Sequence, residues 1–265
     1  MTESWRRPRR LLMAALGGLT VFYLLAPTLV IVPMSFTEAK ILSFPPQGFS
    51  LQWYQRMFTD PQWAAGIQHS AQVGFLTAIL ATALGTLAAL GLTRGRFPGR
   101  TVVNALALSP LIVPVVVIAI GMFAVFVQWK IAGSVVGLVL AHTALALPFV
   151  IVNVGTSLRT IDRNLELAAA NLGADPRRSF LHITLPLILP GVLAGAIFSF
   201  ITSWDEVVVA LFLTSARYRT LPVEMWEQVR SVVDPTVAAV STTLFVVTTA
   251  LLVVLFVVRR QAPAQ

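Results

Sequence analysis

The stretch ELAAANLGADPRRSFLHITLP, Glu166–Pro186, lies between two of the most hydrophobic parts of the chain, yet it is rich in polar residues and keeps a helical pattern. An apolar stripe at helical spacing ends just before Gly173, which stands where a helix needs a left-handed residue to finish. Asp175 and Pro176 then supply an N-cap and a proline at the first helical position. We therefore predict an elbow of two short amphipathic helices, with Pro186 starting the next apolar run. The stripe comprises Ile161, Leu165, Ala168, Ala169 and Leu172.

The rest of the chain has the composition of a membrane protein. Its 265 residues are 57% hydrophobic and only 11% charged, and the mean hydropathy is +0.82. A soluble domain carries about 25% charged residues. Because one core cannot bury this much apolar surface, we expect lipid to be the solvent of the chain. The absence of cysteine excludes disulfides, thiolate catalysis and cysteine-ligated metal sites.

Six apolar runs reach the ~20 residues that a helix needs to cross a bilayer. The first is too long for the apolar region of a signal peptide and lacks a convincing cleavage site, so we expect a retained anchor. Pro110 and Pro114 predict a bend in the third run, and Gly85 and Ala89 predict close helix packing by the second. The runs lie near 11–35, 70–93, 102–127, 131–154, 187–213 and 236–258.

The basic residues predict how these spans are oriented. With the N-terminus inside, 13 of the 19 Lys and Arg fall in cytoplasmic segments, including those of the elbow. Since cytoplasmic loops carry the excess of Lys and Arg, both termini are predicted to be cytoplasmic. The net charge of +8 is then a topology signal, which argues against a nucleic-acid partner. The six outside residues are Lys40, Arg56, Lys130, Arg217, Arg219 and Arg230.

Two interpretations of the elbow follow from its pattern. Its apolar stripe could pack against the inner ends of its own bundle, as an ordinary cytoplasmic loop does. Alternatively the elbow docks in a cleft of a soluble partner, since an amphipathic helix laid in a groove is a common recognition mode. The small side chains of Ala168, Ala169 and Ala170 would permit close approach.

The elbow resembles the EAA motif, E-A-A-x3-G-x9-I-x-L-P, of permease subunits in binding-protein-dependent ABC importers. The leading Glu of the motif falls on Leu167, and Glu166 stands one position earlier. On a helix, Glu166 would point about 100° away from the motif position. The residues that fall on motif positions are Ala168, Ala169, Gly173, Ile183, Leu185 and Pro186.

The resemblance extends over nearly the whole chain, because FPPQGFSLQWY, SPLIVP and SWDEVVVALF resemble the second permease subunit of spermidine/putrescine importers. This implies an all-α integral membrane protein of MetI-like fold, with residues 1–265 forming one six-span permease domain of a bacterial inner membrane. The loop 160–186 would couple it to two ATPase subunits. A different second permease and an external substrate-binding protein would complete the importer. The coupling residues would be Glu166, Ala168, Ala169, Gly173, Asp175, Ile183 and Pro186.

An acidic pair, Asp205 and Glu206, lies within the fifth apolar run. Each charge costs about 2.5–3.5 kcal/mol near the centre of a span. The pair either joins helices as a structural polar contact or forms a station for a desolvated cation, with Trp204 offering a ring face to an ammonium group. Ser203 and Thr202 can donate to the carboxylates. An acidic pair occupies this place in the family that the chain resembles, which favours the cation station.

The sequence shows no enzyme and no cofactor site. The three histidines lack metal-ligand spacing, no nucleophile–base constellation is visible, and no G-x-x-x-x-G-K-[ST] loop is present to hold ATP phosphates. We therefore expect ATP and Mg²⁺ on partner subunits and a polyamine or similar organic cation as substrate. The alternatives are the same scaffold importing an organic anion such as a phosphonate, an ion-coupled secondary transporter, and a static scaffold. The first lacks the Lys or Arg it would need in the fifth run, and no inverted repeat supports the second.

Overall fold

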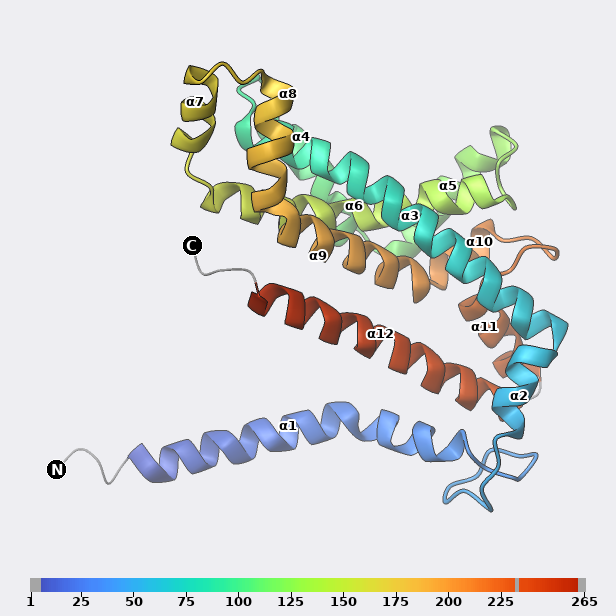
Figure 1. The fold of residues 1–265 in the computed structure, drawn as a ribbon. Helices are drawn as coiled ribbons and strands as arrows, with labels where there is room; N and C mark the ends of the chain where they lie inside the picture. The colour runs from blue at the N-terminus through green and yellow to red at the C-terminus, as the bar shows by residue number, and fades with distance from the viewer. Residues whose placement is uncertain (1–5, 232–233, 262–265) are drawn as a thin grey trace. The chain divides into compact units, whose positions relative to one another are not determined.

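The computed structural model describes residues 6–231 and 234–261, and these residues form an all-α fold (Figure 1). Among them no strand is present, and the one β-bridge joins Ser215 to Tyr218. The predicted fold class is therefore confirmed. The helices are α1 (Arg6–Met34), α2 (Gln52–Thr59), α3 (Pro61–Arg94), α4 (Arg100–Leu108), the 3₁₀ turn η1 (Ser109–Leu111), α5 (Val115–Gln128), α6 (Val135–Thr160), α7 (Asn164–Asn171), α8 (Pro176–Ser179), the π-helical turn η2 (Phe180–Thr184), α9 (Leu185–Trp204), α10 (Val208–Leu213), α11 (Leu221–Ser231) and α12 (Thr236–Gln261).

Five helices in the described part of the chain are long and apolar enough to cross a membrane. The number becomes six when the bent pair Arg100–Leu111 and Val115–Gln128 is counted as one broken span. This agrees with the predicted number of spans, whereas the cytoplasmic location of both termini stays a prediction. The five helices are Leu12–Met34, Pro61–Arg94, Val135–Thr160, Pro176–Trp204 and Thr236–Val257.

The third predicted span, 102–127, is not one continuous helix. Its two halves meet at an angle of 104°. Pro114 adopts a non-helical backbone (φ −55°, ψ 127°) and begins α5 as its N-cap, and Pro110 lies in the 3₁₀ turn that ends the first half. Since proline has no N–H to donate and disfavours a helical residue before it, the two prolines account for the break. The predicted bend is present, and it divides the span into two separate helices.

The fifth predicted span, 187–213, also departs from a single helix at both of its ends. It does not start at Pro186, because α8, η2 and α9 form one continuous helix over Pro176–Trp204. The wider π-helical turn ends at Thr184, two residues before Pro186, whose missing N–H interrupts the hydrogen-bond ladder of a regular α-helix. At its other end the helix stops at Trp204, and α10 begins only at Val208. The acidic pair therefore lies at a helix break.

The chain divides into two compact units, each of which we describe by itself. Unit 1 comprises Met1–Asp60 and Glu227–Val246. Within it, Trp53 of α2 is buried and donates its indole N–H to the carbonyl of Thr37 at 2.7 Å. Arg56 forms an ion pair with Asp234 at 3.0 Å, which joins α2 to the segment before α12. The single permease domain over 1–265 stays a prediction, and its residues 1–5, 232–233 and 262–265 lie outside the described residues.

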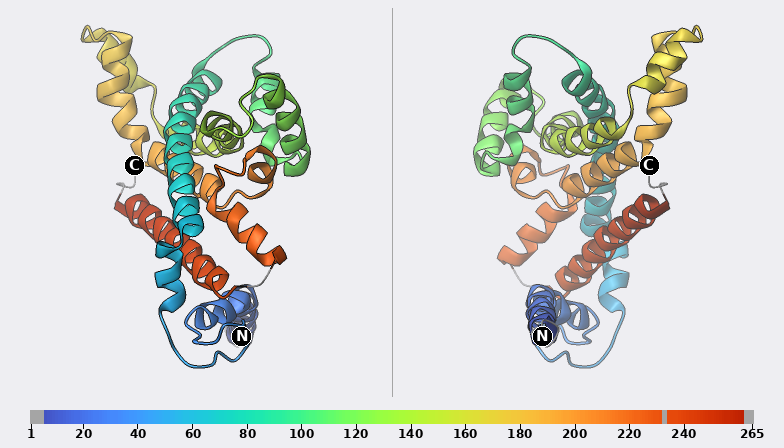
Figure 2. Two further views of the ribbon diagram at one scale, coloured as in Figure 1. Left: turned by 90° about the vertical axis from the view of Figure 1, so that its right-hand side faces the viewer. Right: turned by 90° about the vertical axis from the view of Figure 1, so that its left-hand side faces the viewer.

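Unit 2 comprises Pro61–Trp226 and Val247–Gln265, and its core is formed by α3, α6 and α9 packed against one another (Figures 1 and 2). Gly85 and Ala89 of α3 are buried in this packing, as predicted. A methyl group at Gly85 would lie 2.6 Å from Cβ of Val150 on α6, so only glycine allows the two backbones to come this close. The α6 helix thus packs against both α3 and α9, and it ends where the elbow begins.

Candidate functional site

The elbow projects from one end of unit 2, where α7 lies beside α8 (Figure 1). Gly173 has φ +85°, the left-handed conformation predicted for this position. Its N–H donates to the carbonyl of Ala170, and the N–H of Ala174 donates to that of Ala169, both at 3.0 Å. These two bonds are the Schellman arrangement that closes a helix end. The sharp turn after α7 therefore depends on the left-handed conformation of residue 173, which glycine adopts without strain.

The second arm of the elbow starts at the predicted cap. The Asp175 carboxylate accepts a hydrogen bond from the N–H of Arg178 at 2.7 Å, and Pro176 occupies the first helical position. Because this arm continues through η2 into α9, the prediction of a separate second helix was wrong. A displacement of the elbow would instead pass directly into α9. Ile183 and Pro186 lie on this continuous helix, half-buried and exposed, respectively.

The apolar stripe predicted on the first arm is shorter than expected, because Ile161 does not belong to α7. Ile161 ends α6 and is buried in the core of unit 2, and α7 starts only at Asn164. Of the two predicted alanines, Ala169 is buried and Ala168 is exposed. The leucines of the first arm remain exposed in this chain: Leu165 by 47%, Leu167 by 60% and Leu172 by 89%.

Glu166 joins the elbow to two helices of the bundle. Its carboxylate forms an ion pair with Arg94, the last residue of α3, and accepts a hydrogen bond from the hydroxyl of Thr184 at the end of η2. The bond from Arg94, with a further contribution from Thr184, lowers the pKa of Glu166 below its usual value although partial burial opposes the shift. Glu166 is thus held ionised between α3 and the start of α9.

Sequence reasoning missed Arg94. The signal that could have found it is its isolation, because it is the only charged residue in the whole of α3 and stands at its very end. A cleft of about 360 Å³ beside the ion pair is lined by Arg94, Glu166 and Thr184 together with apolar side chains that include Leu90 and Phe180. The ion pair therefore closes one side of a small space between the elbow and the bundle.

The acidic pair occupies the break between α9 and α10. The Glu206 carboxylate accepts a hydrogen bond from the N–H of Val209 at 2.7 Å and so caps α10. Asp205, the residue after the last turn of α9, has an exposed side chain. The two carboxylates thus differ within the fold: Glu206 bonds the backbone of α10, whereas Asp205 is exposed in this chain and has the hydroxyl of Thr248 on α12 as its hydrogen-bonding neighbour.

The neighbours of the pair differ from those expected. The Ser203 hydroxyl, expected to donate to a carboxylate, pairs with Nδ1 of His142 at 2.7 Å, and both residues are buried. The Trp204 ring is buried and stacks on Phe200, with the ring centroids 5.5 Å apart, so in this structure it offers no open face beside Asp205. The proposed role of Trp204 in a substrate path stays a prediction.

The elbow and the acidic pair are not brought together. They lie at opposite ends of α9, whose 20 residues span about 30 Å. The same helix nevertheless connects Thr184, which binds Glu166, to Ser203, which binds His142. One continuous helix, Pro176–Trp204, therefore runs from the site at one end of the bundle to the site at the other.

Comparisons with known proteins agree with this architecture. Residues 81–264 match the family described as binding-protein-dependent transport system inner membrane component. The chain is 34% identical to the spermidine/putrescine transport system permease protein PotC of Haemophilus influenzae, over 90% of this chain and 93% of that protein. It is 32% identical to the putrescine transport system permease protein PotI of Escherichia coli, over 89% of this chain and 85% of that protein.

A solved structure shows the same fold. The crystal structure of a bacterial ABC transporter involved in the import of the acidic polysaccharide alginate contains a chain that superposes with a TM-score of 0.72 over 99% of both chains, at 16% identity. At this identity the likeness concerns the fold alone. With the family match, the relatives and the spans of the bundle taken together, the chain belongs to the inner membrane components of binding-protein-dependent transport systems, as a multi-pass permease subunit.

Proposed function

We propose that this chain forms half of the translocation path of an ATP-driven importer for polyamines or a similar small organic cation. The observation that carries the substrate class is the exposed carboxylate of Asp205 at the helix break. A cation that leaves water pays several kcal/mol unless a charge compensates it. An anion path would need Lys or Arg side chains, and neither α9 nor α10 contains one. The polyamine names of the two relatives support the same class.

The elbow is the surface on which we place a partner ATPase. Two of its exposed leucines, Leu165 and Leu172, are seven residues apart and share one face of the first arm, and such apolar anchors on a short helix suit a groove in a soluble protein. Two ATPase subunits would hold ATP and Mg²⁺, with no cofactor on this chain. A different permease subunit would supply the other half of the path, and an external binding protein would deliver the substrate.

The orientation that this function requires places the elbow in the cytoplasm of a bacterial inner membrane. The excess of Arg at the elbow end supports it. Because the chain has no cysteine, single cysteines introduced at exposed Phe97 and Arg177 should react with a membrane-impermeant maleimide only after the cells are opened. Those at exposed Ile41 and Arg217 should react in intact spheroplasts, and the reverse pattern would contradict the orientation.

The substrate class is tested with the complete transporter, purified through a tag on this chain and reconstituted in liposomes with its binding protein. We expect ATP-dependent uptake of radiolabelled putrescine or spermidine, competed by the other polyamine and not by a phosphonate. Uptake of the phosphonate without uptake of either polyamine would contradict the proposal. Liposomes loaded with ADP in place of ATP provide the control.

A further inference from the structure

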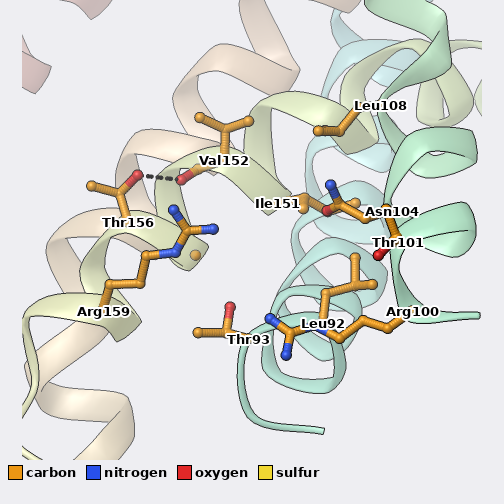
Figure 3. A pocket seen from close by; sticks show the side chains of 11 residues that line it. Leu92, Thr93, Arg100, Thr101, Asn104, Leu108, Ile151, Val152, Thr156 and Arg159 are labelled. Atoms are coloured by element: carbon orange, nitrogen blue, oxygen red, sulfur yellow. Dashed lines mark hydrogen bonds between the residues drawn. The ribbon is translucent and has the colours of Figure 1, made fainter. Parts of the chain in front are cut away.

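A second cleft, of about 410 Å³, lies in unit 2 between the end of α3, the start of α4 and the end of α6 (Figure 3). It is separate from the acidic break and from the cleft beside Glu166. Both α3 and α6 end there and α4 begins there, so the cleft opens at the end of the bundle that carries the elbow. What distinguishes it is how its lining changes with depth.

Along α4 the lining changes from charged to apolar. Arg100, Asn104 and Leu108 follow one another at intervals of four residues and therefore share one helix face. Since α4 starts at Arg100, the guanidinium lies at the end of the bundle and Leu108 lies about 12 Å deeper. One face of this helix thus presents first a cation, then an amide and then a hydrocarbon side chain.

The lining of α6 repeats this change in the opposite chain direction. Arg159, in the last turn, is followed inward by Thr156 and then by Val152, about 10 Å away along the helix. Because α6 ends where α4 begins, the two gradients run the same way in space. Figure 3 shows both guanidinium groups directed toward the space between the helices, with Val152 and Leu108 farther along it. The cleft is therefore amphiphilic, with its charges at the rim.

The two cations of the rim have no acidic partner. Within the described part of the chain neither Arg100 nor Arg159 forms an ion pair, and none of the residues lining the cleft is acidic. Arg100 makes one long hydrogen bond, of 3.4 Å, to the carbonyl of Gly95. The free N–H groups of the first turn of α4 add partial positive charge at the same rim. The polar half of the cleft is thus complementary to an anion, and the apolar half to hydrocarbon.

We propose that this cleft binds an anionic glycerophospholipid. Its phosphodiester lies between Arg100 and Arg159, where guanidinium groups donate paired hydrogen bonds to phosphate oxygens. Thr156 and Asn104 face the glycerol and ester oxygens, and an acyl chain lies along Leu108 and Val152. A free anion would leave the apolar half uncovered, and a basic pocket between membrane helices is a known kind of lipid headgroup site. The proposal requires the chain to be in a membrane and does not depend on the substrate that the importer carries.

The test is lipid binding by the complete transporter, purified through a tag on this chain, stripped of lipid and analysed by native mass spectrometry. The probes are palmitoyl-oleoyl phosphatidylglycerol, the phosphatidylcholine with the same chains, and inorganic phosphate. We expect the phosphatidylglycerol to bind about tenfold more tightly than the phosphatidylcholine, and Arg100→Gln or Arg159→Gln each to weaken its binding about tenfold. Arg100→Lys should keep much of the affinity because it keeps the charge.

Two further variants separate the site from general attraction. Arg96→Gln removes the same charge from an exposed position outside the cleft and should leave lipid binding unchanged. Gly155→Leu adds bulk to the lining with both arginines intact: its Cβ would meet no atom nearer than Oγ1 of Thr93, at 3.7 Å, and the rest of the side chain should occupy the cleft and displace the lipid. Reduced phosphatidylglycerol binding in this variant, with the complex intact, would support the proposal.

Four results would overturn it. Equal losses of phosphatidylglycerol binding in Arg96→Gln and Arg100→Gln would show that the lipid is attracted by the overall positive charge of this region and not by the cleft. Equal binding of the two lipids would show no headgroup recognition. Displacement of the lipid by millimolar inorganic phosphate would identify a site for a soluble anion. A wild-type transporter that binds neither lipid would show that a partner subunit covers the cleft.

Discussion

Arg94, the last residue of α3, forms an ion pair with Glu166 on α7, and the Glu166 carboxylate also accepts a hydrogen bond from the hydroxyl of Thr184. One side chain of the elbow is thereby bonded to the end of one membrane helix and to the start of another. An elbow held in this way cannot rotate without moving α3 or α9, or breaking the ion pair. This makes Glu166 the residue that we expect to transmit a push from a partner ATPase to the bundle.

The first prediction concerns this ion pair. Glu166→Gln should keep a hydrogen-bond acceptor for Thr184 but lose the charge that holds Arg94. We expect the ATPase activity of the reconstituted transporter to lose most of its stimulation by the loaded binding protein, while the complex still assembles. Arg94→Gln should have the same effect, and the double variant should be little worse than either single one, because both remove one interaction.

The control is Arg96→Gln, which changes the same charge two residues later at an exposed position. Wild-type stimulation is expected there. If Glu166→Gln also retained full stimulation, the ion pair would be an ordinary surface contact with no part in coupling.

The second prediction is the pH dependence of the pair. The pKa of Glu166 is lowered in the folded chain, so its contribution to stability is present above the ordinary glutamate pKa and is lost as the pH falls through the lowered value. The pair is partly exposed, and we estimate its contribution at about 1 kcal/mol. The melting temperature of the wild type in detergent should exceed that of Glu166→Gln at pH 7, and the difference should vanish at strongly acid pH. A difference that grew on acidification would contradict the assignment.

The shape of the elbow was predictable because it depends on local chemistry. A left-handed glycine and an Asp-Pro cap act within a few residues of themselves, and Gly173 and Asp175 are found in these roles. The partner of Glu166 was not predictable in the same way, because Arg94 lies on another helix and is brought near only by the packing of α3 against α6. The expected apolar stripe was wrong at Ile161 for a related reason, since Ile161 is the C-cap of α6 and α7 starts only at Asn164.

The third prediction tests the turn at Gly173. An added Cβ would meet no atom within 4 Å, so the backbone conformation, with φ +85°, is what restricts the residue at this position. The left-handed conformation costs an L-residue about 1–2 kcal/mol, and a β-branched residue more. Gly173→Val should therefore distort the end of α7 and abolish the response of the ATPase to the loaded binding protein.

The matched control for this turn is Gly173→Asn, because asparagine enters the left-handed region most readily among residues with side chains. It should retain most of the response, and both variants should reach the membrane in equal amounts. If valine and asparagine were equally tolerated, the conformation of residue 173 would have no part in coupling.

The acidic pair could be located from the sequence, but the surroundings of its two carboxylates could not be predicted. The sequence correctly marked Asp205 and Glu206 as unusual in an apolar run, but a regular helix was assumed through them. In the structure α9 ends at Trp204, and the carboxylate of Glu206 accepts a hydrogen bond from the N–H of Val209 in the first turn of α10. A side chain that caps a helix next to a break has no signature in a pattern of hydrophobic periodicity. The different environments of the two acids therefore come from the structure alone.

The last prediction uses this difference to separate a substrate path from a structural contact. Asp205 is exposed in this chain, and asparagine keeps an oxygen that can accept from Thr248, so Asp205→Asn removes the charge with little effect on the fold. We expect polyamine uptake to fall about tenfold or more while binding-protein affinity is unchanged. Glu206→Gln keeps an oxygen that can accept from Val209 and should be milder. Glu206→Ala loses this cap and should cost about 1 kcal/mol of stability. The double amide variant should be the most severe, since no carboxylate then remains at the break.

Glu227→Gln, at an exposed position on α11, provides the control for loss of an acidic charge elsewhere. Radiolabelled putrescine uptake into liposomes with matched amounts of transporter measures each variant. Near-normal uptake by the double amide variant would remove the acidic pair from the path of the cation.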